Sequence, residues 1–261
     1  MREARRKGGG PRAENGLSAP EAPAARGIRL TGGLMAVFAA LFLLTGIIRI
    51  FAGSAALLGR EMARWAPPER TGLPAEAYGP LAERIAGYLT GRTEELQLEL
   101  PGPDGERTAC FHDYELIHMA DCRGLIRLDG IVCVLCFAGA AGCALRLIRR
   151  ERTERRAVRE EAWRGMKTAL RLMGLFAAAM VLWAAADFDG LFVTFHRAAF
   201  RNDYWLLNPR TDLLIRLMPT EMFADLGLRG LGCFAAGLGL FCAGAYLRLG
   251  REHVSREGRR P

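Results

Sequence analysis

The chain has 261 residues, of which 51% are hydrophobic, and its 36 Lys and Arg residues outnumber its 28 Asp and Glu residues. The length alone would suit one soluble domain. Four runs without a charged residue exclude that class, because the helices of a soluble core seldom stay uncharged on every face. These runs are 31–48, 130–145, 172–186 and 230–247.

The four runs predict an all-α membrane protein with four transmembrane helices. With its flanking residues, each run approaches the roughly 20 residues that a helix needs to cross the hydrocarbon core. Of the 36 Lys and Arg residues 22 fall in 1–30, 146–171 and 248–261, but only 9 of the 28 Asp and Glu residues do. By the positive-inside rule, both termini are expected in the cytoplasm. The basic net charge is therefore a sign of membrane topology and does not indicate nucleic-acid binding.

The chain begins with a segment rich in Gly, Pro, Ala and Arg that has no periodicity, which predicts a disordered tail. A cleaved signal peptide is the alternative, but the first apolar run is longer than the roughly 7–15 residues of a signal core.

The predicted division of the whole chain has nine parts. They are a cytoplasmic tail (1–30), a first transmembrane helix (31–57), an extracytoplasmic domain (58–125), a second transmembrane helix (126–148), a cytoplasmic basic loop (149–167), a third transmembrane helix (168–188), an extracytoplasmic segment with short interfacial helices broken at Pro219 (189–228), a fourth transmembrane helix (229–248) and a cytoplasmic tail (249–261).

The domain between spans one and two is expected to be a small α+β unit. Leu81, Ile85 and Leu89 share one helical face, and Gly91 suits the stop of that helix. "LQLEL" alternates as a strand does, "PGPDGE" contains turn residues, and "RTACF" can return antiparallel, which predicts a hairpin. Asp113 is the expected N-cap of the helix that leads into span two.

Two histidines are expected at the same height, just outside the outer leaflet. Counting about 20 residues outward along spans two and three places the outer boundary near residues 128 and 188. At about 1.5 Å per helical residue, His118 and His196 lie roughly 15 Å and 12 Å above it. Such a pair suits acid–base catalysis. A metal site that adds a nearby carboxylate is the alternative use, although no ligand spacing such as HExxH is present.

Two acids flank the first histidine along its helix. Glu115 and Asp121 stand at i−3 and i+3 from His118, where a carboxylate can hold one ring nitrogen and raise the basicity of the other. Asp187 and Asp189 lie at the mouth of span three, where acids are costly without a partner. Arg49, at the outer end of span one, is the expected partner of these two acids.

Residues 187–209 hold further candidates for supporting roles. Phe195 and Trp205 can line a site, although aromatic residues here also suit an interfacial belt. Asn202 is a supporting candidate that also suits a turn. Cys110 and Cys122 face outward in this topology and could form a disulfide in an oxidising exterior.

Four stretches of the chain resemble the bacterial lipoprotein intramolecular transacylases. They are "YLTG", "YELIHMAD" before span two, "DFDGLFVTFHRAAFRNDYWLLNP" after span three, and "DLLIRLMPTEMF" before span four. The resemblance covers about 31–248, and the two histidine motifs are its specific part. The family pattern is "FHxxFF". Here "FHRAAF" keeps Phe200 and has Ala199 beside it, which changes the lining and leaves the chemistry intact.

The resemblance implies an enzyme that acts on a diacylated lipoprotein in the outer leaflet of the cell membrane, without a cofactor. It would move the sn-2 acyl chain of the S-diacylglyceryl group to the α-amine of the N-terminal cysteine, which gives the N-acyl lyso-form. His118 and His196 would be the catalytic histidines. Because of its flanking acids we expect His118 to be the base, and His196 to orient the substrate or stabilise the oxyanion. A non-enzymatic accessory subunit and a metal-dependent lipid-ester hydrolase are the alternatives.

Overall fold

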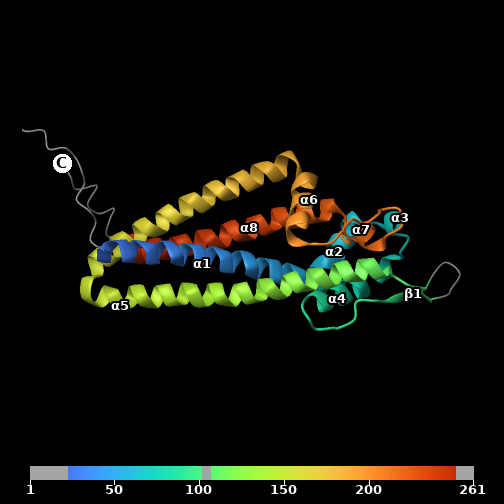
Figure 1. Cartoon of the computed structure of the whole chain (residues 1–261), viewed down its shortest axis with the longest axis horizontal. Coiled ribbons are helices and arrows are strands. Elements are labelled where there is room, and N and C mark those ends of the chain that lie inside the picture. The colour runs from blue at the N-terminus through green and yellow to red at the C-terminus, as the bar shows by residue number, and fades with distance from the viewer. Residues whose placement is uncertain (1–22, 102–106, 251–261) are drawn as a thin grey trace, which may run out of the picture.

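The computed structural model describes residues 23–101 and 107–250. Its regular structure is almost entirely helical, and three long helices run along the long axis of the molecule (Figure 1). They are α1 (Pro23–Gly53), α5 (Asp113–Ala186) and α8 (Thr220–Ala245). The shorter elements gather at one end of the long helices, which we call the head (Figure 1).

The head combines short helices with one small hairpin. Its elements are α2 (Ala55–Trp65), α3 (Pro68–Thr71), the 3-10 helix η1 (Ala75–Ala77), α4 (Tyr78–Leu89), β1 (Glu99–Pro101), β2 (Arg107–Ala109), the first turns of α5, α6 (Phe188–Ala199) and α7 (Leu213–Leu217). At the opposite end of the molecule α8 continues into a π-helical turn, η2 (Tyr246–Gly250).

Helix α5 consists of two antiparallel arms. Glu154 has φ −138° and ψ 54°, which is not helical, and the chain reverses direction there. The first arm leads away from the head and the second arm returns toward it (Figure 1). Residues 149–167, the predicted basic connection between spans two and three, are helical on both sides of this single break.

The long helices have the surfaces of a membrane protein. Within 23–101 and 107–250, three helices are long and apolar enough to cross a membrane, namely Pro23–Gly53, Asp113–Ala186 and Thr220–Leu249, and the second includes both arms of α5. Leu175 on the second arm and Leu240 on α8 are 71% and 76% exposed. Apolar exposure along a whole helix would be unfavourable in water, whereas lipid accommodates it because the backbone hydrogen bonds are satisfied within the helix.

Helix α1 and the second arm of α5 cross in close contact because glycines lie at the crossing. A Cβ atom on Gly32 would overlap the backbone of Ala162, and one on Gly165 would overlap the carbonyl of Arg29. Small residues allow two helix backbones to approach closely inside a membrane. The buried residues around this crossing are Ile28, Ala36, Leu147, Val158, Ala162, Met166 and Leu249.

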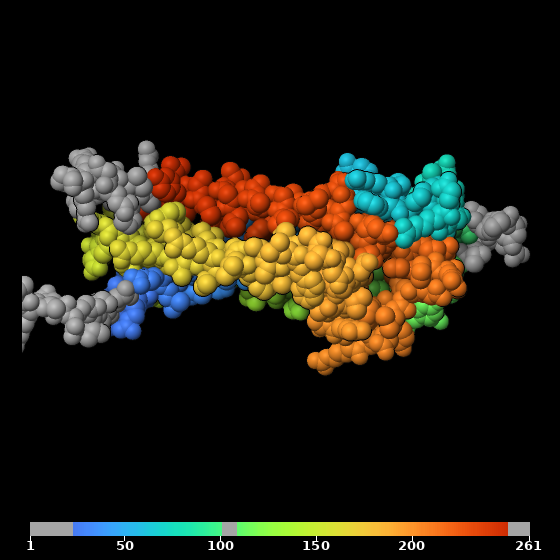
Figure 2. Space-filling model, turned by 90° about the horizontal axis from the view of Figure 1, so that it is seen from above, coloured from blue at the N-terminus to red at the C-terminus, as the bar shows by residue number. Residues whose placement is uncertain are grey.

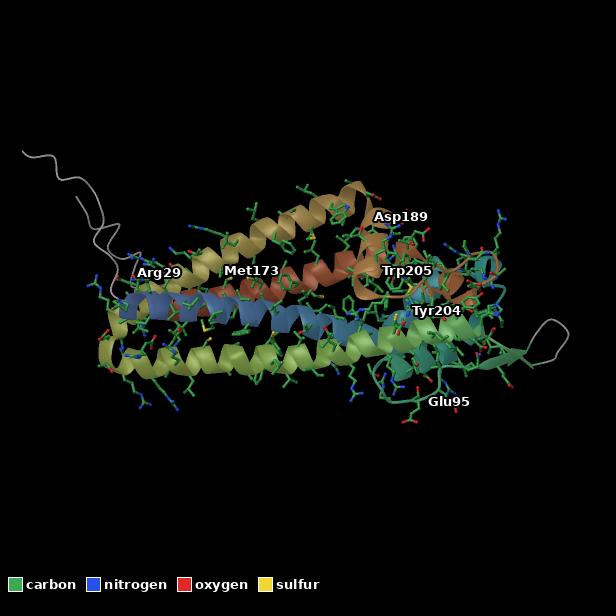
Figure 3. The ribbon with its side chains drawn as sticks, viewed as in Figure 1. Arg29, Glu95, Met173, Asp189, Tyr204 and Trp205 are labelled. Carbon is green, nitrogen blue, oxygen red and sulfur yellow. The ribbon has the colours of Figure 1, made fainter. Side chains whose placement is uncertain are left out.

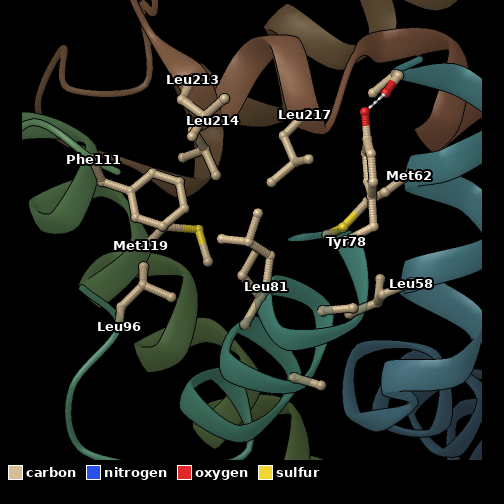
Figure 4. Close-up of a cluster of buried hydrophobic side chains, with 14 of the residues drawn as sticks. Leu58, Met62, Tyr78, Leu81, Leu96, Phe111, Met119, Leu213, Leu214 and Leu217 are labelled. Carbon is tan, nitrogen blue, oxygen red and sulfur yellow. Dashed lines mark hydrogen bonds between the residues drawn. The ribbon is translucent and has the colours of Figure 1, made fainter. Parts of the chain in front are cut away.

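One hydrophobic core unites the two outer segments of the chain in the head (Figure 4). Helices α2 and α4 and the start of α5 come from the first outer segment, while α7 and the first turn of α8 come from the second. Figure 4 shows the side chains of this core from both, including Leu58, Met62, Tyr78, Leu81, Leu96, Phe111, Met119, Leu213, Leu214 and Leu217. The head is thus one packed unit, and burial of these side chains stabilises both segments together.

Local predictions for the head are confirmed in part. Helix α4 buries Leu81 and Ile85 completely, and Gly91 follows it with φ 76°, as expected of a helix stop. Strands β1 and β2 pair antiparallel with Glu99 opposite Ala109, but each has only three residues. The head is therefore mostly helical, with one short hairpin. The turn predicted over "PGPDGE" lies largely in 102–106, outside the described residues.

The N-cap of α5 is His112, one residue before the predicted Asp113. The side chain of Glu115 accepts a hydrogen bond from the backbone N–H of His112 at 2.8 Å, and the His112 side chain accepts one from the N3 backbone. This reciprocal arrangement is a capping box, and it satisfies two of the donors that a helix start leaves unpaired.

Two boundaries of the long helices differ from the prediction. Helix α1 begins at Pro23, so 23–30 are helical and only 1–22 of the predicted tail lie outside the described residues, as do 251–261. The break at Pro219 is present, and α8 begins directly after it at Thr220, well before the predicted 229. A proline suits this place because the first turn of a helix needs no N–H from it.

Candidate active site

His118 and His196 meet in the head, one from α5 and one from α6. Their ring centroids are 5.9 Å apart with an angle of 35° between the ring planes. Both are buried, with 7% and 8% of their surface exposed. The proximity expected from their matched heights is therefore present.

Helix α6 brings His196 to this place because the chain turns at Asp187. This residue is not helical, with φ −156° and ψ 81°, and it separates the second arm of α5 from α6. Its carboxylate accepts a hydrogen bond from Gly190 N at 2.8 Å and so caps the new helix. Asp187 thus has a structural role two turns before His196.

Among the described residues, the hydrogen bonding of His196 leaves one ring nitrogen free. Its Nδ1 lies 2.7 Å from the carbonyl oxygen of Phe192. A carbonyl oxygen can only accept, so Nδ1 donates and carries the proton. In the neutral ring Nε2 is then an unprotonated acceptor, which is the form of a general base.

Aromatic rings surround His196 and keep water away from it. Phe192 and Trp205 lie 4.2 Å and 5.2 Å from its ring centroid, and Phe200 lies at 5.5 Å. Phe195 contacts it edge-on at 5.4 Å while remaining 55% exposed itself. Burial lowers the pKa of His196 below its ordinary value, although the hydrogen bond to Phe192 acts in the opposite direction.

One nitrogen of the His118 ring is in hydrogen-bond contact with a cysteine. Its Nε2 lies 3.6 Å from Sγ of Cys122, one helical turn further along α5. Among the described residues, Nδ1 of His118 is buried without a hydrogen-bond partner. Burial, followed by the charge of His196, lowers the pKa of His118 to about 4, and Asp121 opposes this shift only in part. His118 is therefore neutral near pH 7.

The acids that flank His118 are not its hydrogen-bond partners. Glu115 is completely buried, and its second oxygen accepts from Leu214 N at 2.7 Å. Asp121 accepts from the side-chain amide of Asn202 at 2.9 Å, which ties α5 to the turn after α6. The expectation that a flanking carboxylate holds the ring of His118 is thus wrong, because other donors occupy both carboxylates.

Arg49 does not pair with the acids at the start of α6. Its Nη1 donates to the carbonyl of Ile126 at 3.1 Å, and its charge acts on Asp129. Asp189 instead lines an open hollow of about 310 Å³ together with residues of α8, a hollow that neither histidine lines. The predicted pairing is therefore wrong.

Residues 33–223 match the family described as lipoprotein intramolecular transacylase Lit. The matched stretch includes both histidines and most of the chain. The chain belongs to the lipoprotein intramolecular transacylase family. It is therefore a membrane-bound acyltransferase.

Solved structures share the fold of this transacylase. The membrane integral lipoprotein intramolecular transacylase Lit from Bacillus cereus is 19% identical, with a TM-score of 0.65 over 88% of this chain and 97% of that chain. A variant of that protein with one histidine changed to alanine gives 16% identity, a TM-score of 0.65 and the same coverage. No curated protein matches the chain significantly.

Cys110 and Cys122 are both free thiols in the transacylase, so the disulfide considered from the sequence is not formed. Burial, with a contribution from the charge of Asp121, raises the pKa of the Cys122 thiol to about 12. The sequence offers a signal for the contact of Cys122 with His118, namely their i, i+4 spacing on one helix.

Asp129 is a second residue that sequence reasoning missed. It stands directly before the charge-free run of span two, where a carboxylate needs a cationic partner. Its Oδ2 is buried and, among the described residues, accepts no hydrogen bond.

Trp205 follows α6 and contacts His196, whereas Asp189 lies at the start of α6 in a hollow that neither histidine lines. Figure 3 shows Trp205 and Tyr204 after α6, at the junction of the head with the long helices, and Asp189 at the start of α6. In the part of the chain that the structure describes, no group of three or more His, Cys, Asp or Glu side chains is placed to hold a metal ion.

Proposed function

We propose that this transacylase moves the sn-2 acyl chain of a diacylated lipoprotein onto the α-amine of the lipoprotein's N-terminal cysteine, which leaves an N-acyl lyso-form. The observation that carries the proposal is the pair of buried imidazoles, each with one nitrogen hydrogen-bonded and the other without a partner in the part of the chain that the structure describes. The pair lies where the head joins helices with lipid-compatible surfaces, which suits a substrate that is partly lipid.

We further propose four membrane passes with both termini in the cytoplasm and the site at the extracytoplasmic face of the cell membrane. The two arms of α5 would supply the second and third passes. The excess of Arg and Lys over Asp and Glu in 146–171, around the reversal of α5 at the end opposite the head, supports this orientation. The space-filling view shows long helices that run from the far end of the molecule to the head (Figure 2).

A labelling experiment tests this orientation. Cysteines introduced as Glu95→Cys in the head and Arg152→Cys at the α5 reversal should react from opposite sides of the membrane with an impermeant maleimide. Glu95 is exposed and its side chain points away from the head (Figure 3), and Arg152 is exposed at the other end. Reaction of both positions from one side would contradict the four-pass topology.

The proposed reaction begins with attack of the α-amine nitrogen on the carbonyl carbon of the sn-2 ester. An N–C bond forms, and Nε2 of His196 accepts the proton of the amine. The former carbonyl oxygen becomes an oxyanion, which N–H at Nδ1 of His118 stabilises. Such a donor contributes about 3–4 kcal/mol in comparable sites.

The intermediate then collapses. The C–O bond to the glycerol breaks, and the leaving glycerol oxygen takes the proton from His196, which returns to its neutral form. The acyl chain has moved from oxygen to nitrogen, and the glycerol retains a free hydroxyl. Amine and ester belong to one molecule, so positioning is the main task of the site. No cofactor is consumed in these steps.

This assignment reverses the roles expected from the sequence, since the acids that favoured His118 as the base are occupied elsewhere. The aromatic side chains of Phe195 and Trp205 would exclude water from the amide-forming step. Asn202, through Asp121, would hold the turn that carries Trp205.

Mass spectrometry of lipoprotein N-termini tests the proposed function. Purified enzyme in lipid should convert a diacylated lipoprotein to the N-acyl lyso-form. His118→Ala and His196→Ala should each abolish the conversion while the protein remains inserted and folded. Wild-type rates in both variants would contradict the proposal. If fatty acid were released and chelator stopped the reaction, the metal-dependent hydrolase would replace it.

A further inference from the structure

Cys122 stands in the candidate site without a role in the reaction proposed above. It lies one turn after His118 on α5, and its Sγ is 3.6 Å from Nε2 of the histidine. The other outer cysteine, Cys110, also packs against the head core but contacts neither histidine by any hydrogen bond of the described residues.

We infer that Cys122 is a positioning residue: its thiol donates to Nε2 of His118, keeps the ring proton on Nδ1, and so presents an N–H to the substrate. The inference rests on the proposed function for its effect on the rate. The position of the ring proton can be measured without any substrate.

The thiol is able to act as the donor in this contact. Cys122 is partly buried, and its pKa of about 12 keeps the sulfur protonated at neutral pH. A thiol is a weak donor and a weak acceptor, whereas a neutral imidazole nitrogen is a good acceptor. Bonding of S–H to Nε2 therefore pairs the thiol with the stronger of the two acceptors.

The unpaired nitrogen of His118 supports the same arrangement. Its Nδ1 is buried and has no hydrogen-bond partner among the described residues, and the residue as a whole is only 7% exposed. A buried polar atom without a partner is rare in proteins, and at a functional site a missing ligand explains it. The carbonyl oxygen of an ester, and the oxyanion formed from it, would accept a hydrogen bond from N–H at this position.

The two histidines then present different nitrogens. His196 has Nδ1 occupied by the carbonyl of Phe192, which leaves the lone pair of Nε2 for a proton. His118 has Nε2 occupied by Cys122, which leaves N–H at Nδ1. Both rings carry the proton on Nδ1, yet one accepts and the other donates, as the two halves of the reaction require.

The charged groups around His118 leave this arrangement undisturbed. Asp121 on the same helix is bonded to Asn202, and the carboxylate of Glu115 is bonded to two backbone N–H groups. His196 on α6 is the other titratable group that faces it, and burial keeps that ring neutral as well.

Nitrogen NMR of enzyme labelled at its four histidines tests the inference in lipid nanodiscs at pH 7. His118→Asn assigns the His118 signals by their loss. We expect wild-type His118 to carry its proton on Nδ1, and Cys122→Ala to shift the ring toward the other tautomer. Cys110→Ala is the matched control and should leave the His118 signals unchanged. A wild-type proton on Nε2, or identical ring signals in Cys122→Ala, would overturn the inference.

Kinetics separate positioning from folding. Cys122→Ala should lower kcat about tenfold with little change in KM, which is less than the 10²–10³ lost with a whole oxyanion donor. Cys122→Ser, whose hydroxyl can donate to the same nitrogen, should restore most of the loss. An unchanged kcat in Cys122→Ala would overturn the catalytic part. If wild-type enzyme formed no lyso-lipoprotein at all, the proposed function would fail while the tautomer measurement would still stand.

Discussion

Glu115 and Leu214 join the two outer segments of the chain through one buried hydrogen bond, in which Leu214 N donates to Glu115 Oε1 at 2.7 Å. The other carboxylate oxygen accepts from His112 N. The side chain of Glu115 thus caps the start of α5 and also accepts a hydrogen bond from a backbone N–H at the start of α7. The acid that precedes His118 in the first histidine motif is therefore part of the scaffold that holds the site.

Removal of this carboxylate should destabilise the head. Glu115→Ala leaves two backbone N–H groups without their acceptor, and we expect a loss of about 2–4 kcal/mol in the free energy of unfolding. The control is Glu95→Ala, at an exposed position, which should change stability by less than about 0.5 kcal/mol. Thermal unfolding in detergent measures both. Equal melting temperatures for the two variants would contradict this role.

Amide substitutions at the two histidines distinguish donor from base. His118→Asn places an N–H near the position of Nδ1 and should retain part of the activity, because an amide can donate a hydrogen bond. His196→Gln should be inactive, since an amide accepts no proton at neutral pH. His112→Asn is the matched control because asparagine is a good N-cap. Initial rates of lyso-form production measure all three, and the reverse pattern would return the role of base to His118.

Arg49 and Asp129 should be energetically coupled inside the membrane. Arg49→Leu leaves Asp129 without a nearby cation, which should cost about 2–3 kcal/mol of unfolding free energy. The double variant Arg49→Leu, Asp129→Asn should be less destabilised than the sum of the single variants, with a coupling of about 0.5–3 kcal/mol. The double-mutant cycle is measured by unfolding in detergent. Additive effects would show that Arg49 and Asp129 do not interact.

The glycines at the crossing of α1 and α5 predict that a Gly→Ala substitution changes stability in opposite directions at two positions. Gly165→Ala inserts a Cβ against the carbonyl of Arg29 and should lower the melting temperature. Gly174→Ala, on the same arm, meets nothing within 4 Å. It should be neutral or stabilise the helix by up to about 1 kcal/mol. A similar melting temperature in both variants would show that the crossing is not tight.

Stability should depend on pH through His118. Burial lowers the pKa of this ring from 6.5 to about 4 in the folded protein. Between these values the unfolded chain binds a proton that the folded protein does not, so stability falls as pH falls from about 6.5 toward 4 and is unaffected above. The slope from one proton approaches about 1.4 kcal/mol per pH unit. Denaturant unfolding of His118→Asn should give a shallower slope over this range, and an equal slope would refute the assignment.

Several features of the protein follow from the sequence alone because they depend on neighbouring residues. The charge-free runs predict long apolar helices, since composition within one segment decides whether a helix tolerates lipid. Gly91 and Pro219 predict a helix end and a helix start, because both residues restrict the backbone locally. Counting along two helices also predicts that His118 and His196 lie near each other. The two rings do meet, although the turn at Asp187 means that α6 does not continue the second arm of α5.

Only the tertiary structure decides which of these groups form hydrogen bonds or ion pairs with one another. Glu115 could have served His118, yet it bonds to Leu214, which is distant in the sequence and arrives with α7. Arg49 had acids available at the start of α6, but packing of α1 against α5 places it beside Ile126. Hydrogen bonds and ion pairs act over a few ångströms, so the sequence determines which side chains are available, and the packing of the helices selects the partners.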